Sequence, residues 1–282
     1  MKIVKTIEEV RAEVRAWRKE GLTVGLVPTM GFLHEGHRSL IERAVSENDR
    51  VVVSDFVNPT QFGEGEDLEA YPRDIDRDAA LCSEAGAALI FNPEVSEMYA
   101  DGACTMVDMQ GEMTTGLCGK TRPIHFRGVC TVVSKLFNIV TPDRAYFGQK
   151  DAQQLSVIKR MVKDFNFGIE IVGCPIVREP DGLAKSSRNT YLNEEERQAA
   201  LVLSKAVKKG QEMISAGEKD LDKVTAEMKA LISAEPLARI DYVEAVDAET
   251  IKPVSSTDDC DQLLVAMAVY VGKTRLIDNF MI

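Results

Sequence analysis

Two histidines three residues apart stand in segment 27–37, which reads Val-Pro-Thr-Met-Gly-Phe-Leu-His-Glu-Gly-His. An apolar run (22–27) precedes the loop and an amphipathic pattern (38–46) follows it, so the sequence predicts strand, loop and helix. Unpaired N–H groups and the dipole at a helix start suit phosphate binding. His34 and His37 at such a junction can donate hydrogen bonds to oxyanions and stabilise charge that develops on a phosphate. The alternatives are a surface turn or half a metal site, although zinc needs three or four ligands and no third is indicated nearby.

A second group of polar side chains follows the apolar strand predicted at 51–57. Its unbroken β-branched run indicates a parallel strand covered on both faces. Ligands in open α/β sheets bind beyond the carboxyl ends of strands, so we expect Asn58 and Gln61 to face the same crevice as the histidines. A polar turn punctuated by Asn-Pro is the open alternative.

A second strand–Gly–helix junction lies at Gly148-Gln149-Lys150-Asp151, after a short strand predicted at 144–147. The helix dipole disfavours a lysine at a helix start, so an anionic ligand explains Lys150 better than stability does. Asp151 has an equally good structural explanation as a helix-start residue.

Three further clusters keep both a functional and a structural interpretation. Lys185 and Arg188 flank two serines, and all four side chains can address phosphate oxygens, unless they form a solvated loop. Segment 121–128 gathers two arginines and the third histidine before a helix, either as an anion clamp or as an exposed loop. Asp76 and Asp78 could help to hold Mg²⁺, but a solvated helix face is the simpler interpretation.

Composition narrows the class of protein. The 282 residues suit one large or two modest domains, and a net charge of −11 argues against nucleic acid or an anionic membrane as partner. No apolar run approaches the ~20 residues of a membrane span, and the first residues lead straight into a charged helix rather than a signal peptide. The six scattered cysteines indicate reduced thiols, so we expect a cytoplasmic protein.

The order of elements predicts an α/β fold, a doubly wound parallel sheet of the Rossmann-like kind, followed by a smaller α+β domain. Strands and helices alternate as far as about 177. Two helical stretches (194–215 and 219–233) and strands at 239–246, 263–271 and 274–278 then follow. We therefore expect domains 1–176 and 177–282.

Six motifs stand together in one order: Pro28-Thr29-Met30-Gly31, His34-x-Gly-His37, Phe56-Val57-Asn58-Pro59-x-Gln61-Phe62, Tyr71-Pro72-Arg73, Gly148-Gln149-Lys150-Asp151-x-Gln153-Gln154 and Lys185-Ser186-Ser187-Arg188-Asn189. This order resembles the pantothenate synthetase (pantoate–β-alanine ligase) family of the HIGH-motif nucleotidyltransferase superfamily. The resemblance is specific from about 2 to 192 and looser beyond.

The resemblance implies that (R)-pantoate attacks the α-phosphate of ATP, with Mg²⁺ present, to give pantoyl adenylate and pyrophosphate. The amine of β-alanine then attacks the adenylate and releases pantothenate and AMP. A homodimer is also implied. The implied catalytic residues are His37, His34 and Lys150. The implied ATP-binding residues are Met30, Gly31, Phe32, Leu33, His34, Glu35, Gly36, His37, Gly148, Gln149, Lys150, Asp151, Val177, Lys185, Ser186, Ser187 and Arg188. The implied residues for pantoate and β-alanine are Gln61, Gln154, Asn58, Pro28 and Met30.

Two positions depart from the family pattern, because Gln149 stands where glutamate is more usual and Lys185 where methionine is. Both changes make the region near the phosphates more positive. Three rivals remain: a nucleotidylyltransferase that uses a phosphate ester, a fragment of an aminoacyl-tRNA synthetase, and a nucleotide-sensing module without catalysis. Pyrophosphate release that depends on pantoate would separate these from the ligase.

Overall fold

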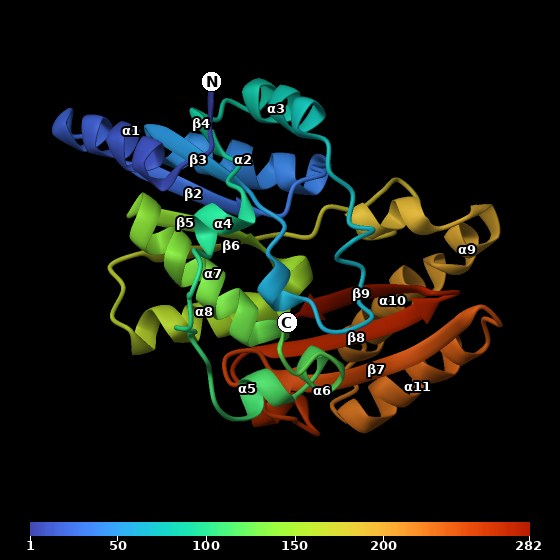
Figure 1. Cartoon of the computed structure of the whole chain (residues 1–282). Helices are drawn as coiled ribbons and strands as arrows, with labels where there is room; N and C mark the ends of the chain where they lie inside the picture. Colours follow the sequence, from blue (N-terminus) through green and yellow to red (C-terminus); the bar gives the residue numbers. More distant parts are fainter. The chain divides into compact units, whose positions relative to one another are not determined.

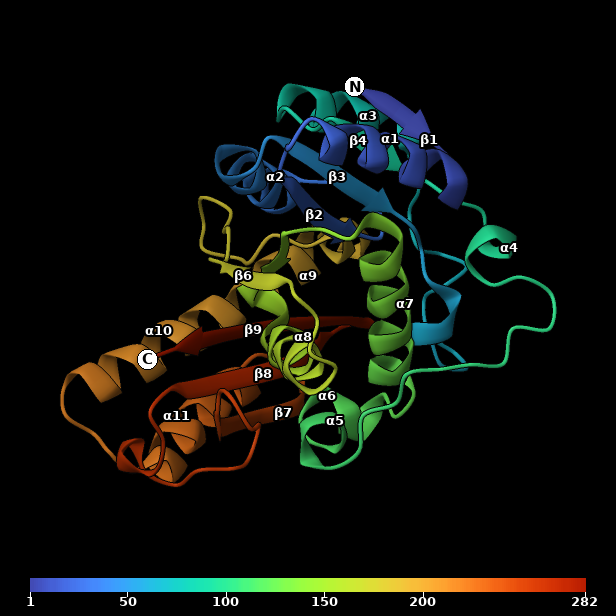
Figure 2. The ribbon, with the colours of Figure 1, turned by 90° about the vertical axis from the view of Figure 1, so that its left-hand side faces the viewer.

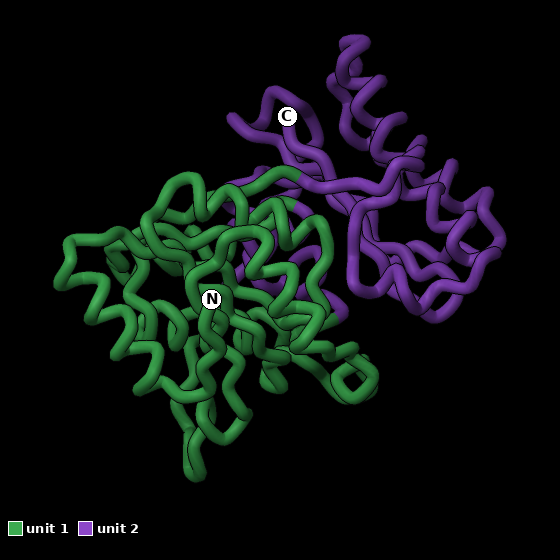
Figure 3. The backbone as a smooth tube through the Cα atoms, turned by 90° about the horizontal axis from the view of Figure 1, so that it is seen from above, with its two compact units in different colours: residues 1–109, 122–149, 157–175 green, residues 110–121, 150–156, 176–282 purple.

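The computed structural model describes all residues, 1–282, and the chain divides into two compact units (Figure 3). Unit 1 comprises residues 1–109, 122–149 and 157–175. Unit 2 comprises residues 110–121, 150–156 and 176–282, so two short excursions of the N-terminal half belong to it. None of the helices is both long and apolar enough to cross a membrane.

Unit 1 is built on a six-stranded parallel sheet in the order β1-β4-β3-β2-β5-β6 (Figure 1). Its strands are β1 (Lys2–Val4), β2 (Val24–Thr29), β3 (Arg50–Asp55), β4 (Leu89–Phe91), β5 (Arg144–Gly148) and β6 (Glu170–Cys174). The helices between them are α1 (Ile7–Lys19), α2 (Glu35–Glu47), α3 (Ile75–Glu84), α4 (Val95–Met98), α7 (His125–Val140) and α8 (Ala152–Asp164), the last of which begins in unit 2.

Helices cover both faces of this sheet, which explains why its central strands are apolar throughout. Helices α2 and α3 share one core with the strands, while α7 contacts β2 and α1 (Figure 2). Val51, Val52 and Val53 of β3 are at most 1% exposed, because successive side chains meet helices on opposite faces. The predicted doubly wound parallel sheet is thus confirmed.

Unit 2 is built on a three-stranded antiparallel sheet, β7-β8-β9. Its strands are β7 (Ala238–Asp247), β8 (Leu263–Val271) and β9 (Thr274–Met281), and its helices are α5 (Glu112–Thr115), α6 (Cys118–Thr121), α9 (Glu194–Ala199), α10 (Leu201–Ser215) and α11 (Leu221–Ser233). Short 3-10 turns complete the chain: η1 (Pro59–Gln61), η2 (Gln149–Asp151), η3 (Ser187–Tyr191) and η4 (Thr257–Asp259).

The central strand β8 is buried on both faces. Alternate residues such as Val265 and Met267 join the core under α10 and α11. The residues between them, such as Leu264, pack with Leu117 and Ala152 from the two excursions. The predicted small α+β domain is therefore confirmed. The core of its sheet includes residues from all three stretches of unit 2.

Three local predictions differ from the structure. Segment 2–4 is an edge strand that pairs with β4, rather than a lead into a helix, because three residues are too few to show a period. The single helix expected at 194–215 turns at Ala200, whose carbonyl accepts from the Leu203 N–H in a 3-10 manner. The last strand extends to Met281, beyond the expected 278.

Candidate active site

The loop between β2 and α2 places both histidines at the helix N-terminus. His34 is the N-cap, and its Nδ1 accepts from the Gly36 N–H at 3.1 Å. His37 Nδ1 in turn accepts from the His34 N–H at 3.3 Å, which closes a capping box made of two imidazoles. The ring centroids are 4.1 Å apart. Because both Nδ1 atoms accept from the backbone, the neutral rings carry their protons on Nε2, where a proton can be donated to an anion.

The backbone ahead of the histidines contains two consecutive residues with positive φ. Gly31 has φ +78°, and a Cβ there would collide with Asp55 Oδ1, so only glycine fits. Phe32 follows in the left-handed region with φ +50°. Thr29 Oγ1 accepts from the Gly31 N–H at 3.2 Å. This strained turn lies directly beyond the end of β2.

Asp78 of α3 holds the strained turn in place. It is only 1% exposed, and its two carboxylate oxygens accept the N–H groups of Phe32 and Leu33 at 2.6 Å each. The carboxyl of Asp55, at the end of β3, is hydrogen-bonded to it. Burial, and next the charge of Asp78, raise the pKa of Asp55 to about 7. Burial likewise raises the pKa of Asp78, although the two backbone donors oppose that shift.

The predicted solvated helix face is therefore wrong for Asp78 and holds for Asp76, which is exposed. The other interpretation of Asp76 and Asp78 was that they help to hold Mg²⁺. Both oxygens of Asp78 already accept from the backbone, and no three His, Cys, Asp or Glu side chains lie together as a metal ion would need. The residues of the chain do not by themselves form a cage for Mg²⁺.

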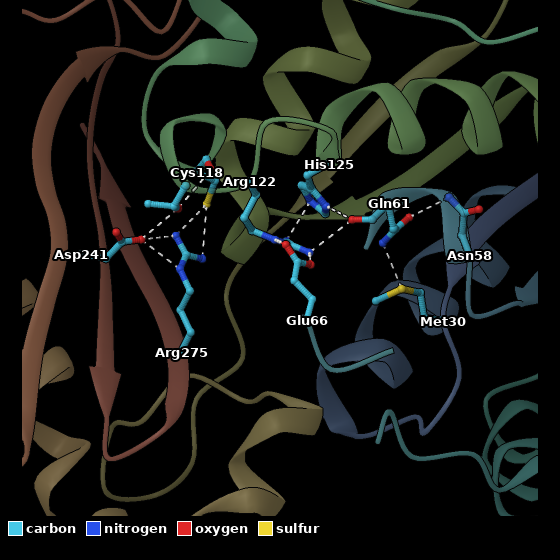
Figure 4. A network of polar contacts seen from close by, with 10 residues as sticks. Met30, Asn58, Gln61, Glu66, Cys118, Arg122, His125, Asp241 and Arg275 are labelled. Atoms are coloured by element: carbon cyan, nitrogen blue, oxygen red, sulfur yellow. Dashed lines mark hydrogen bonds and ion pairs between the residues drawn. The ribbon is translucent and has the colours of Figure 1, made fainter. Parts of the chain in front are cut away.

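Gln61 lies in η1, beyond the end of β3, and is held from two sides (Figure 4). Its main-chain carbonyl accepts from His125 Nδ1 at 3.1 Å and from Arg122 Nη2 at 3.4 Å. Its side-chain Oε1 accepts from Asn58 Nδ2 at 3.1 Å, and its Nε2 lies 3.0 Å from the sulfur of Met30. Figure 4 shows Gln61 between His125 on one side and Asn58 on the other.

Two side chains of the cluster predicted at 121–128, Arg122 and His125, thus hold the main chain of Gln61. Arg122 is ion-paired with Glu66 at 2.5 Å, and the two side chains are 13% and 22% exposed. Burial by itself would raise the pKa of Glu66, but the pairing with Arg122 outweighs burial and lowers it. His125 is buried, and its Nε2 lies 3.2 Å from Arg122 Nη1. The structure therefore supports neither of the two simple alternatives, because these side chains bind the loop that carries Gln61, while Arg127 is exposed.

In unit 2, the start of α8 is fixed from both sides. Asn279 of β9 donates to the main-chain carbonyl of Lys150 at 2.9 Å. The buried amide of Gln153 accepts from the Cys118 N–H at 3.0 Å and donates to the carbonyl of Gly116 at 2.9 Å. The backbone that carries Lys150 is consequently well defined within unit 2.

The loop of unit 2 that carries Ser186 and Ser187 is held by hydrogen bonds within the loop itself. The Lys185 N–H donates to the Val177 carbonyl at 2.9 Å, so two residues predicted on the nucleotide are neighbours. Ser186 caps η3 through the Arg188 N–H at 3.3 Å. Glu179 lies 3.9 Å from the Lys185 ammonium and anchors this loop.

The sequence matches the family model described as pantoate-beta-alanine ligase over residues 2–281. The chain belongs to the pantoate–β-alanine ligase family. A pantothenate synthetase of Clostridium acetobutylicum is 61% identical over 280 residues, which cover 99% of both chains.

Solved structures of the family have the same fold. The crystal structure of pantothenate synthetase from Thermus thermophilus has a TM-score of 0.93 at 46% identity, with 99% of both chains covered. The pantoate-β-alanine ligase of Francisella tularensis, complexed with β-γ ATP and β-alanine, has a TM-score of 0.80 at 35% identity. The match covers 99% of this chain and 97% of that one. The resemblance inferred from the motifs is thus confirmed.

Within this ligase fold, the structure brings the predicted residues into two local groups. In unit 1, the turn from Pro28 to His37 and the pair Asn58 and Gln61 follow adjacent strands, since Pro28 and Thr29 pair with Ser54 and Asp55. Gly148 ends β5 and Gln149 begins η2, both in the same unit. The remaining predicted residues belong to unit 2: Lys150, Asp151, Gln154, Val177, Lys185, Ser186, Ser187 and Arg188.

Three residues that support this ligase site were not predicted from the sequence as single residues, namely Asp55, Gly128 and Tyr99, whose hydroxyl donates to Asn58 Oδ1 at 2.8 Å. Asp55 carried one signal, because it is an acid at the end of an otherwise apolar strand. Gly128 carried another, because a glycine in the first turn of a helix costs stability unless another backbone lies close. The role of Tyr99 depends on contacts that sequence spacing does not reveal.

Proposed function

We infer that the chain condenses (R)-pantoate with β-alanine at the expense of ATP, through pantoyl adenylate. The pantoate carboxylate attacks the α-phosphate and expels pyrophosphate, and the β-alanine amine then displaces AMP. A carboxylate is a weak nucleophile toward an anionic phosphate, so the site must align the two reactants and stabilise developing negative charge. No covalent enzyme intermediate is needed, because the adenylate already activates the acyl group.

The observation that carries this proposal is the imidazole capping box of His34 and His37. It presents two Nε2–H donors at the positive end of α2, where phosphate binding is favoured. We assign His37 as the proton donor and His34 as its partner on the phosphates. Lys150 is assigned to the phosphates as well, and Gln61 and Gln154 to pantoate.

The remaining assignments follow the family. The backbone from Met30 to Glu35 and the motif around Gly148 are assigned to the nucleotide, as are Val177 and the loop from Lys185 to Arg188. The C-terminal domain, 177–282, is proposed to close over the nucleotide and keep water from the adenylate. Mg²⁺ is proposed to arrive on the ATP phosphates, since the chain offers no cage of its own. A cytoplasmic homodimer completes the proposal.

The test is pyrophosphate release from ATP, measured with and without pantoate and β-alanine. We expect release that requires pantoate, with AMP and pantothenate formed once β-alanine is added. His37→Asn keeps an acceptor for the His34 N–H but removes the Nε2 donor, so it should fold normally and lose about 10²–10³-fold in rate. Pyrophosphate release at the same rate with and without pantoate would overturn the substrate assignment. Wild-type rates in His37→Asn would overturn the role of His37.

A further inference from the structure

Asn58 has no hydrogen-bonding capacity left for a ligand. Its side chain is 1% exposed, and Oδ1 accepts from the Tyr99 hydroxyl at 2.8 Å and the Thr60 hydroxyl at 3.0 Å. Its Nδ2 donates to Gln61 Oε1 at 3.1 Å and to the Gly128 carbonyl at 3.2 Å. A primary amide has two donor hydrogens and two acceptor lone pairs, and all four are used here.

The orientation of this amide is determined by backbone groups. The Gly128 carbonyl can only accept, so Nδ2 must face it, and the Thr60 N–H, 3.4 Å from Oδ1, can only donate. Nδ2 therefore also donates to Gln61, whose Oε1 must accept. It follows that Gln61 directs its Nε2–H group to the other side, toward Met30. A thioether is a weak hydrogen-bond acceptor, so a substrate oxygen in its place would form a stronger hydrogen bond with Gln61.

The main chain of Gln61 has equally little freedom. A Cβ on Gly128 would lie 2.5 Å from the Cα and the N of Gln61, so helix α7 contacts η1 backbone to backbone. His125 and Arg122 hold the Gln61 carbonyl, as described above. With main chain and Oε1 both held, the Nε2–H group is the part of Gln61 that is oriented for a ligand.

We infer that Tyr99 and Asn58 form a positioning relay that orients the Gln61 amide, so that the site offers a hydrogen-bond donor to an acceptor oxygen of the substrate acid. Asn58 is thereby assigned as a positioning residue, rather than as a direct ligand of pantoate. Tyr99, which follows α4, supplies the shortest bond to Asn58 and ties its own segment to the site. This inference rests on the proposed function only for the identity of the substrate.

The first test compares Tyr99→Phe with a matched control. The Tyr146 hydroxyl donates to Glu47 at 2.9 Å and accepts from Asn48 at 2.7 Å in unit 1, so Tyr146→Phe removes a hydrogen-bonded hydroxyl elsewhere. Loss of one hydrogen bond predicts that kcat/KM for pantoate falls about three- to tenfold in Tyr99→Phe, with KM for ATP unchanged. Tyr146→Phe should leave both constants unchanged. An equal fall in kcat/KM for pantoate and for ATP, or no fall for pantoate, would overturn the relay.

A double-mutant cycle tests whether Tyr99 acts through Gln61. In a Gln61→Ala background, Tyr99→Phe should cause no further loss of kcat/KM for pantoate. An additive loss would show an independent, merely structural role and would overturn the relay.

A measurement without substrate separates the relay from the substrate assignment. The side-chain NH₂ signal of Gln61 in a ¹⁵N–¹H spectrum is identified by its absence in Gln61→Glu. We expect it to shift in Tyr99→Phe and not in Tyr146→Phe. An unmoved signal would overturn the relay whatever the substrate is. A shifted signal in an enzyme that ignores pantoate would support the relay and overturn the proposed function.

Discussion

The hydrogen-bonded carboxyl pair behind the strained turn makes the stability of unit 1 depend on pH. Asp55 is 8% exposed, and its pKa is raised from 3.8 to about 7 in the folded protein. A group whose pKa is raised by folding contributes most stability below its unfolded pKa, and this contribution is lost as the pH rises through the folded value. Asp55→Asn removes the titration, while its Nδ2–H group can still donate to Asp78 as the protonated carboxyl does.

The magnitude follows from the difference between the pKa values. Between pH 5 and pH 7, folded Asp55 holds a proton that the unfolded chain has already lost, at about 1.4 kcal/mol per pH unit. The free energy of unfolding of Asp55→Asn, relative to wild type, should therefore rise by about 3 kcal/mol from pH 5 to pH 8. The sign follows from the raised pKa, because the wild type loses stability as the pH rises through the folded value, whereas Asp55→Asn has no titrating group at this position.

Urea unfolding of both proteins at pH 5, 6, 7 and 8 measures this difference. Asp49→Asn is the matched control, since exposed Asp49 accepts from the Thr23 hydroxyl at 2.7 Å, and that bond lowers its pKa. Its effect should stay constant over this range, because Asp49 is ionised in both states. A difference for Asp55→Asn that changes by less than about 1 kcal/mol would refute the raised pKa of Asp55.

Two further substitutions probe close packing and buried charge. Gly128→Ala should force η1 away from α7, lower kcat/KM for pantoate and cost about 1–3 kcal/mol of stability. The control Gly168→Ala, with open space around its Cβ, should be neutral or slightly stabilising. Equal effects of the two substitutions in activity assays and thermal melts would contradict the contact of Gly128 with Gln61. Arg178 binds both carboxylate oxygens of Asp278 at 2.7 and 2.9 Å but stays 30% exposed. Asp278→Asn should therefore lower the free energy of unfolding in urea by about 2–3 kcal/mol, less than the loss of a partner in a fully buried ion pair. A cost below about 0.5 kcal/mol would show that the pair is dispensable.

The sequence predicted the parts of the fold that depend on local apolar patterns. The continuous apolar runs of β2 and β3 predicted buried strands, and both strands were found. Strand β1 was missed because its three residues show no period, and it forms by pairing with β4, which lies far along the chain.

The candidate site was predictable in its residue types and less so in their roles. Asn58 was expected near the histidines because it follows a strand, and the structure places it beyond β3, the strand that pairs with β2. Its role changed, because its partners Tyr99 and Gly128 lie 41 and 70 residues further along the chain. Asp78 changed in the same way, since a helix pattern shows a polar face but not the two backbone N–H groups that the carboxylate binds.

The division of unit 2 into three stretches has a consequence for synthesis on the ribosome. By residue 175 the nascent chain contains all six strands of the parallel sheet, so unit 1 can form early. Leu117 and Ala152 nevertheless remain uncovered until β7 and β8 emerge, because their packing partners include Tyr242 and Leu264. A chain that terminates early therefore exposes apolar side chains of these two excursions, which are the kind of surface that chaperones and proteases recognise.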